Sequence, residues 1–182
     1  WLGTSLGLRV VRGDRIVKPS EPVGRSVEGA PFAPLFAMPI TALCRDGENG
    51  LLVAVGAAGK SSGGGLFALD LRSLNARRLG PDAASLATRI SGAEIWTLAR
   101  ARDGAVWAAS IRGVLRIGRD GSVRLVDSKA GLPDDSVDAI NAAPDGSVWL
   151  STDRGLAHLA AEGTVQRVYG FTEGLPSRQG IV

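Results

Sequence analysis

The 182-residue chain contains little cysteine and histidine, and each shortage excludes a kind of chemistry. The lone cysteine, Cys44, cannot form a disulfide within the chain. The lone histidine, His158, excludes a histidine-rich metal site and disfavours a Ser-His-Asp triad. No apolar run reaches the ~18 residues of a membrane span. The residues given, from Trp1 onward, do not match the basic and apolar pattern of a secretory leader, and an upstream segment carrying one stays open. We therefore expect no bound metal and no organic cofactor.

Lysine is also scarce, so arginine supplies most of the positive charge behind the formal net charge of +3. The basic residues are scattered singly, without an aromatic stripe, which argues against a nucleic-acid partner. Hydrophobic residues make up 45% of the chain and charged residues 21%, as in a soluble globular domain. The 25 glycines and 9 prolines predict frequent turns.

A repeated stretch organises the sequence. In the segments 1–10, 106–118 and 148–160, a tryptophan is followed six positions later by a glycine. Two of these tryptophans are preceded by an Asp-Gly pair, which predicts a β-hairpin with a type I′ turn. The repeat residues are Trp1 and Gly7, Trp107 and Gly113, Trp149 and Gly155, with Asp103-Gly104 and Asp145-Gly146 upstream.

Three further strands complete each repeat. One precedes the Asp-Gly turn, at 40–44, 95–99 and 137–141. Two follow the tryptophan strand, within 8–17, 114–126 and 156–168, and are joined at Gly13, Gly121 or Gly163. Four antiparallel strands over roughly 42 to 54 residues are typical of a β-propeller blade.

The predicted fold class is therefore all-β, a β-propeller of four-stranded antiparallel blades with about four blades present. A single meander cannot cover both its faces, so blades must stack, and the tryptophan is large enough to fill the gap between them. Stacking of the tryptophan on a cofactor or sugar is the alternative. We expect one partial domain over 1–182, with blades at 1–18 (lacking its inner strand), 38–80, 93–127 and 135–170, and a further inner strand beginning at 177–182.

Two short motifs imitate functional sites. Ala54, Gly59, Lys60 and Ser61 satisfy a loose phosphate-loop pattern, but such a loop must open onto a helix. The following residues, 64–70, read as a strand, so we interpret the motif as a six-residue insertion in a hairpin, with Val53 in the tryptophan position. The Arg-Gly-Asp triplet at 12–14 could suggest integrin recognition, but its place at a shared turn indicates a hairpin corner.

Residues 131–159 and 174–182 resemble the two-component-regulator propeller repeat. The matching residues in the fuller copy are Gly131, Leu132, Pro133, Asp145, Gly146, Val148, Trp149, Thr152, Gly155 and Leu156. The resemblance is specific over 93–182, clear over 1–18 and weak over 19–92, where the Gly-Leu-Pro signal is missing and a proline-rich connection lies at 18–39.

That resemblance implies a sensor domain of a bacterial hybrid histidine kinase or diguanylate cyclase, on the periplasmic side of the inner membrane. It implies a propeller of about seven blades, with membrane attachment and any dimer contacts supplied by other segments. We expect the chain to be a fragment of such a sensor. A closed four-bladed ring, made by pairing the last strand with residues 1–8, is the alternative.

Candidate ligand-binding residues fall into two groups. Aligning the inner strands on Leu43, Leu98 and Ile140 places Thr41, Trp96 and Asp138 at equivalent positions, where they could form a polar-aromatic ring around the axis. Packing of Trp96 on its neighbour and turn capping by Asp138 are the alternative. The loop candidates, for which local turn chemistry is the alternative, are Asp134, Asp135, Ser136, Arg178 and Gln179.

Three functions fit these patterns. The first is a non-enzymatic sensory domain that binds an unknown small molecule, such as a carbohydrate, or a partner domain. The second is an enzyme that resembles the streptogramin lyases, for which residues 103–121 have some likeness. The third is a protein-interaction platform. An enzyme of the lyase type needs a general base near the axis, and His158 falls in a third strand instead.

Overall fold

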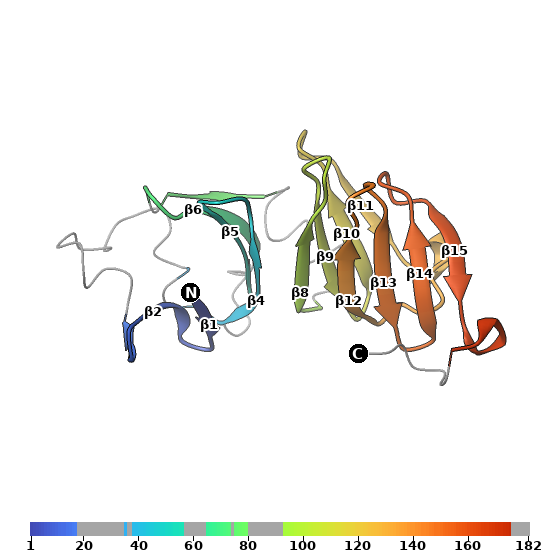
Figure 1. The fold of residues 1–182 in the computed structure, drawn as a ribbon, viewed down its shortest axis with the longest axis horizontal. Helices are drawn as coiled ribbons and strands as arrows, with labels where there is room; N and C mark the ends of the chain where they lie inside the picture. Colours follow the sequence, from blue (N-terminus) through green and yellow to red (C-terminus); the bar gives the residue numbers. More distant parts are fainter. Residues whose placement is uncertain (18–34, 36–37, 57–64, 74, 80–92, 176–182) are drawn as a thin grey trace.

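The structure, a computed structural model, describes residues 1–17, 35, 38–56, 65–73, 75–79 and 93–175. These residues form four antiparallel sheets, with two short 3-10 helices, η2 (Ser128–Ala130) and η3 (Phe171–Glu173) (Figure 1). The fold is all-β, as predicted. Each sheet is a meander, because neighbouring strands follow one another along the chain.

The first sheet has three strands and the other three have four each. The first contains β1 (Leu2–Thr4), β2 (Gly7–Arg12) and β3 (Arg15–Val17). The second contains β4 (Ile40–Arg45), β5 (Gly50–Val55), β6 (Gly65–Asp70) and β7 (Ala76–Arg78). The third contains β8 (Thr97–Arg100), β9 (Val106–Ser110), β10 (Gly113–Ile117) and β11 (Val123–Val126). The fourth contains β12 (Val137–Ala142), β13 (Val148–Thr152), β14 (Gly155–Leu159) and β15 (Val165–Tyr169).

The sheets are successive blades of an open arc. The inner strands β4, β8 and β12 contact one another in turn, and β1 contacts β4. The first and fourth sheets lie at opposite ends of the long axis (Figure 1), so the described strands do not form a closed four-bladed ring. The predicted strand at 177–182 lies outside the described residues.

Each pair of neighbouring blades encloses its own hydrophobic cluster, as the stacking argument requires. Trp107 of β9 is fully buried against Val148 and Leu150 of the next blade. Val106 and Ala108, on the opposite face of the same strand, pack instead against Leu52 and its neighbours in the second blade. A third cluster joins the first two blades. Alternation along a strand therefore sends side chains to two different interfaces.

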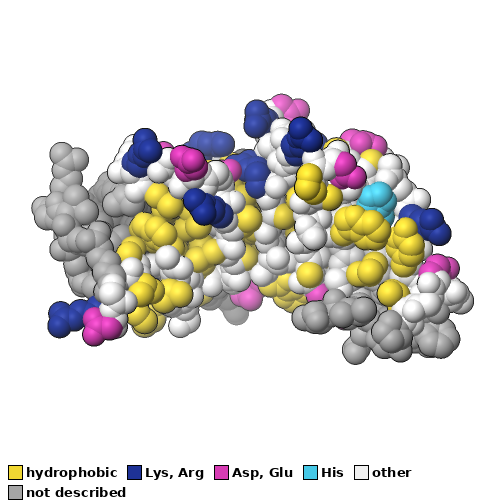
Figure 2. Space-filling view, viewed as in Figure 1, with side chains coloured by type: hydrophobic (Ala, Val, Ile, Leu, Met, Phe, Trp, Pro, Cys, Tyr) yellow, Lys and Arg dark blue, Asp and Glu magenta, His cyan; other side chains and the backbone are white. Residues whose placement is uncertain are grey.

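The repeated tryptophan fills such a gap only at Trp107. Trp149 is half-buried on the face of the fourth blade that no described sheet covers, where its ring stacks on His158 (centroids 4.4 Å apart) and Tyr169 (5.6 Å). His158 thus lies in the third strand of its blade, as expected. It is the cyan side chain in Figure 2.

The assignment of Val53 to the tryptophan position is wrong by one residue. Leu52 pairs with Cys44, as Trp107 pairs with Ala99 on the same two strands of the next blade. The hairpin of the second blade closes at the pair formed by Val55 and Gly65, one residue before Gly56, and this places Leu52 in the tryptophan position. A one-residue shift reverses the face of a strand.

The glycines that follow Trp107 and Trp149 are required by close backbone packing. Gly113 has φ 101°, and a Cβ there would lie 2.5 Å from the carbonyl oxygen of Val126. A serine or threonine three residues earlier completes the hairpin: the Ser110 hydroxyl donates to the Gly113 carbonyl oxygen (3.0 Å) and accepts from the Arg112 backbone N–H (3.1 Å). Thr152 does the same beside Gly155.

The Asp-Gly hairpins were predicted with type I′ turns, and this detail is wrong. The Gly104 N–H donates to the Ala101 carbonyl and the Ala101 N–H donates to that of Ala105, so the loop has three residues and Gly104 (φ 82°) is its left-handed bulge residue. The Asp103 carboxylate accepts from the Ala105 N–H at 2.8 Å. Aspartate is favoured there as a side-chain acceptor for the turn.

The segment that resembles a phosphate loop connects two paired strands of a hairpin. Residues 57–64, which include Gly59, Lys60 and Ser61, lie outside the described residues, but β6 begins at Gly65 and pairs antiparallel with β5. A strand therefore stands where a phosphate loop needs a helix. The triplet at 12–14 is also a hairpin corner, between the paired residues Arg12 and Arg15. The strand expected at 95–99 begins later, at Thr97.

Candidate functional site

Thr41, Trp96 and Asp138 occupy one structural position in three successive blades. Their alignment anchors Leu43, Leu98 and Ile140 pair with equivalent residues of the second strands, namely Val53, Ala108 and Leu150. Thr41 and Asp138 are each skipped by the strand register, which marks a β-bulge at the start of β4 and of β12. Trp96 directly precedes β8. We call these three residues the bulge row; bulges often redirect side chains beside binding sites.

Trp96 joins the third and fourth blades while much of its ring stays in water. Its indole N–H donates to the carbonyl oxygen of Val137, 2.6 Å away, on the neighbouring inner strand. The side chain is nevertheless 40% exposed. Because the hydrogen bond fixes the orientation of an exposed aromatic face, the indole can serve as a stacking platform for a solute.

Asp138 lies beside Val137, so the structure brings it close to the Trp96 contact. Partial burial raises the pKa of the Asp138 carboxyl, and the nearby carboxylates of Asp153 and Asp134 raise it further. Neighbouring negative charges disfavour ionisation of a carboxyl group. The Asp138 carboxyl is therefore protonated more easily than an isolated aspartate, and it can exchange hydrogen bonds with a polar solute.

Sequence reasoning missed Glu94, which lies near the other end of the bulge row. A Cβ added at Gly56 would lie 3.1 Å from Cγ2 of Thr41 and 3.4 Å from Oε1 of Glu94, so these groups meet where the second and third blades join. The sequence spacing could have indicated Glu94, because it precedes Trp96 by two residues, and residues two apart in an extended segment lie on the same side.

The loop candidates are held by local contacts, as the turn-chemistry alternative proposed. The Asp134 carboxylate accepts from the Ser136 N–H (2.9 Å) and pairs with the Arg154 guanidinium (3.0 Å). The Ser136 carbonyl accepts from the Asp153 N–H at 3.3 Å. These contacts join the loop to the β13–β14 hairpin and leave little capacity for a ligand.

Asp135 ties the same loop to the third blade. Its carboxylate accepts from the Ser128 N–H (2.7 Å), a bond that lowers the pKa of this carboxyl. Its carbonyl oxygen accepts from the Gly113 N–H at 2.7 Å. Arg178 and Gln179 lie outside the described residues. Among the predicted site residues that the structure describes, Trp96 of the bulge row is the one with an exposed side chain; the others are half-buried.

Two further observations concern metal and membrane. Within the described ranges, no group of three or more His, Cys, Asp or Glu side chains is placed to hold a metal ion. None of the helices in the described part of the chain has the length and apolar character needed to cross a bilayer.

Comparison with known proteins places this fold. No family model matches the sequence, and no curated protein matches it. Among solved structures, the chain is similar to the extracellular domain of BT3049 from B. thetaiotaomicron, assigned to the hybrid two-component systems. The TM-score is 0.68 at 18% identity over 98% of this chain and 22% of that one. The extracellular domain of BT4673 from the same organism, assigned to the one-component systems, gives 0.65 at 15% identity over 99% and 21%.

A weaker similarity links the chain to virginiamycin B lyase from Staphylococcus aureus, with a TM-score of 0.54 at 16% identity over 77% of this chain and 42% of that one. The chain spans about a fifth of the length of the two B. thetaiotaomicron extracellular domains, 22% and 21% respectively. At these identities the similarities establish the fold: the chain is a set of propeller blades of the kind found in those extracellular domains.

Proposed function

We propose that this chain is part of an extracytoplasmic sensor domain of a bacterial signal-transduction protein. In this proposal the blades belong to a larger propeller of about seven, and they bind a small polar solute or a partner domain at the bulge row. The bound state is passed to an output module, of the histidine kinase or diguanylate cyclase type, that lies outside this chain. The chain itself has no catalytic role.

The observation that carries the proposal is the fold similarity to BT3049, which extends over 98% of this chain but only 22% of that extracellular domain. The bulge row adds a location. Propellers gather their inner strands near one axis, and ligands bind where loops from several elements converge. Here Thr41, Trp96 and Asp138 hold equivalent positions at the start of three adjoining inner strands.

The proposal is tested by a thermal-shift screen of the purified chain against neutral oligosaccharides and other polar solutes. A ligand that binds only the native state raises the melting temperature by mass action. Trp96→Ala should abolish the shift, because it removes the exposed ring. Trp96→Phe is the matched control, since it keeps an aromatic face and loses only the hydrogen bond to Val137.

A hit that survives Trp96→Ala and Asp138→Asn unchanged would contradict the bulge row as the site. A screen in which no solute moves the melting temperature would favour an interaction platform over a solute sensor. The output module is tested separately on the gene: a membrane span followed by a kinase or cyclase module is the expected arrangement, whereas a free-standing secreted propeller would contradict it.

The lyase alternative has less support from the residues. The chain's only histidine, His158, lies in the third strand of the fourth blade, stacked on Trp149. A general base must reach the reacting proton, and the inner strands supply no histidine for this. An assay for cleavage of a streptogramin B substrate would test this alternative directly, and we expect no turnover.

A further inference from the structure

A cleft lies at the opposite end of the blades from the bulge row. The bulge row marks the start of the inner strands, and this cleft lies where they end, at the Asp-Gly turns. It has a volume of about 550 Å³ and lies between the second and third blades. Buried side chains of Leu79, Val106 and Ile117 form its apolar part.

Arginine dominates the polar lining. The lining residues include four arginines, Arg77, Arg100, Arg102 and Arg119, and a single acidic residue, Asp46. They come from separate elements: β7, the end of β8, the β8–β9 turn and the β10–β11 turn. Figure 2 shows several Lys and Arg side chains, with Asp and Glu side chains among them, along the upper edge of the second and third sheets.

Only one of these arginines is neutralised by the cleft itself. Arg100 forms an ion pair with Asp46 and also donates to the Gly104 carbonyl oxygen at 2.7 Å. Within the part of the chain that the structure describes, Arg77, Arg102 and Arg119 have no acidic partner. Because the Arg102 guanidinium donates to Pro144 of the fourth blade, the excess in the cleft comes from Arg77 and Arg119 and is about two positive charges, which attract anions in a partly enclosed site.

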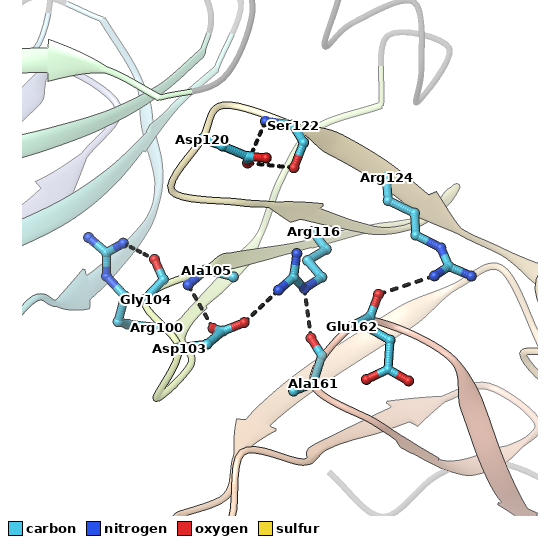
Figure 3. Close-up of polar contacts among 10 residues, drawn as sticks. All are labelled: Arg100, Asp103, Gly104, Ala105, Arg116, Asp120, Ser122, Arg124, Ala161 and Glu162. Atoms are coloured by element: carbon cyan, nitrogen blue, oxygen red, sulfur yellow. Dashed lines mark hydrogen bonds and ion pairs between the residues drawn. The ribbon is translucent and has the colours of Figure 1, made fainter.

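Neighbouring carboxylates do not offset this excess by direct pairing, because they are engaged elsewhere (Figure 3). Asp103 pairs with Arg116, which also donates to the Ala161 carbonyl oxygen of the fourth blade. Asp120 accepts from the Ser122 N–H (3.0 Å) and hydroxyl (2.6 Å).

The two arginines of the turns have different surroundings. Arg102 donates to the Pro144 carbonyl oxygen at 2.8 Å, which directs its guanidinium toward the fourth blade and away from the cleft. The Arg119 guanidinium lies over Gly104, where a Cβ would collide with it. Gly104 also needs its positive φ of 82°. Glycine at position 104 therefore permits both the turn and the close approach of the Arg119 guanidinium. A guanidinium that is already confined loses less conformational freedom when it binds a ligand.

We propose that this cleft binds a small anion through a carboxylate, sulfate or phosphate group. Arginine forks match these planar or tetrahedral oxyanions by paired hydrogen bonds. The volume of about 550 Å³ suits a small solute rather than a macromolecule. The apolar part of the cleft accommodates the uncharged body of the ligand. This site is separate from the bulge row and does not depend on the proposed sensory function.

The test is titration calorimetry of the purified chain at low ionic strength with sulfate, phosphate, glucuronate and glucose. Saturable binding of at least one anion is expected, and glucose, the uncharged analogue of glucuronate, should not bind at this site. The ranking of the three anions identifies the preferred group. Arg77→Gln and Arg119→Gln should each weaken anion binding about tenfold, the usual effect of losing one charge-assisted hydrogen bond.

Arg15→Gln is the matched control, because Arg15 is exposed in β3 of the first blade and its loss changes net charge equally. It should leave anion affinity unchanged, whereas Asp46→Asn should tighten binding about threefold by removing the competing carboxylate. Circular dichroism of each variant reports its folding. Absence of saturable anion binding, or equal losses in Arg15→Gln and Arg119→Gln, would overturn the proposal. Failure of the bulge-row screen would leave this result standing.

Discussion

Replacement of Trp107 and of Trp149 tests the stacking of blades, because the same repeat position meets two environments. Trp107 is fully buried between the third and fourth blades. Trp149 is half-buried on a sheet face that no described blade covers. If tryptophan stabilises the fold by filling the gap between blades, truncation must cost far more at the first position than at the second.

The expected magnitudes follow from burial. Trp107→Ala removes a large enclosed side chain and leaves a cavity, a change that costs about 3–5 kcal/mol. The cost of Trp107→Ala should fall near the lower limit, about 3 kcal/mol. The buried Nε1 of Trp107 has no hydrogen-bond partner among the described residues, and an unsatisfied donor carries a penalty of about 1–3 kcal/mol, which the substitution removes. Trp149→Ala forfeits ring stacking and part of the covered area, about 1–2 kcal/mol.

Urea denaturation of the 182-residue chain, followed by circular dichroism, measures both losses as shifts of the midpoint at constant slope. Trp107→Phe is the control: it retains most of the volume and removes the unpaired donor, so its cost should be about 1 kcal/mol or less. Equal destabilisation by Trp107→Ala and Trp149→Ala would refute the argument, because burial between blades would then not decide the contribution of the residue.

Three other predictions concern glycine, a carboxyl group and an ion pair. Gly113→Ala should lower the free energy of unfolding by about 2–4 kcal/mol in urea denaturation, and Gly121→Ala by about 1 kcal/mol. Both glycines have positive φ, but only a Cβ at Gly113 would collide with backbone atoms. Similar costs for the two substitutions would contradict this explanation. Asp138→Asn should raise the free energy of unfolding at pH 7 by about 0.5 kcal/mol or less, measured by urea denaturation, since a raised folded-state pKa means that ionisation destabilises the fold. That gain should vanish as the pH falls below the unfolded pKa of about 3.9, and a gain that persists there would have another cause. Asp46→Asn should cost about 1–2 kcal/mol by breaking the contact with Arg100 between two blades, and less in 1 M salt; a loss independent of salt would argue against an ionic origin.

The fold could be predicted because its repeat is local. The spacing from Trp107 to Gly113 and from Trp149 to Gly155 records a hairpin whose geometry depends on a few adjacent residues. The second blade lacks this spacing because its hairpin is longer, so the sequence pattern points to Val53 in the tryptophan position instead of Leu52. Side chains alternate regularly between the two faces of a strand, but the position of a turn decides which residues lie on which face.

The candidate sites depend on contacts between blades and were harder to predict. The equivalence of Thr41, Trp96 and Asp138 followed from alignment, yet nothing in the alignment placed Glu94 beside Thr41 or joined the Trp96 indole to Val137. The loop candidates had the right residue types, but aspartate and serine serve turns as readily as ligands.

The sequence by itself determined the strand order, the blade as the repeating unit and the need for blades to stack, because hydrophobic alternation and turn residues act over a few positions. Only the tertiary structure decided which face each tryptophan covers and which charges remain unpaired. The arginines of the cleft illustrate the reason: Arg77 and Arg119 are 42 residues apart in number, and their shared cleft exists only once two blades have packed side by side.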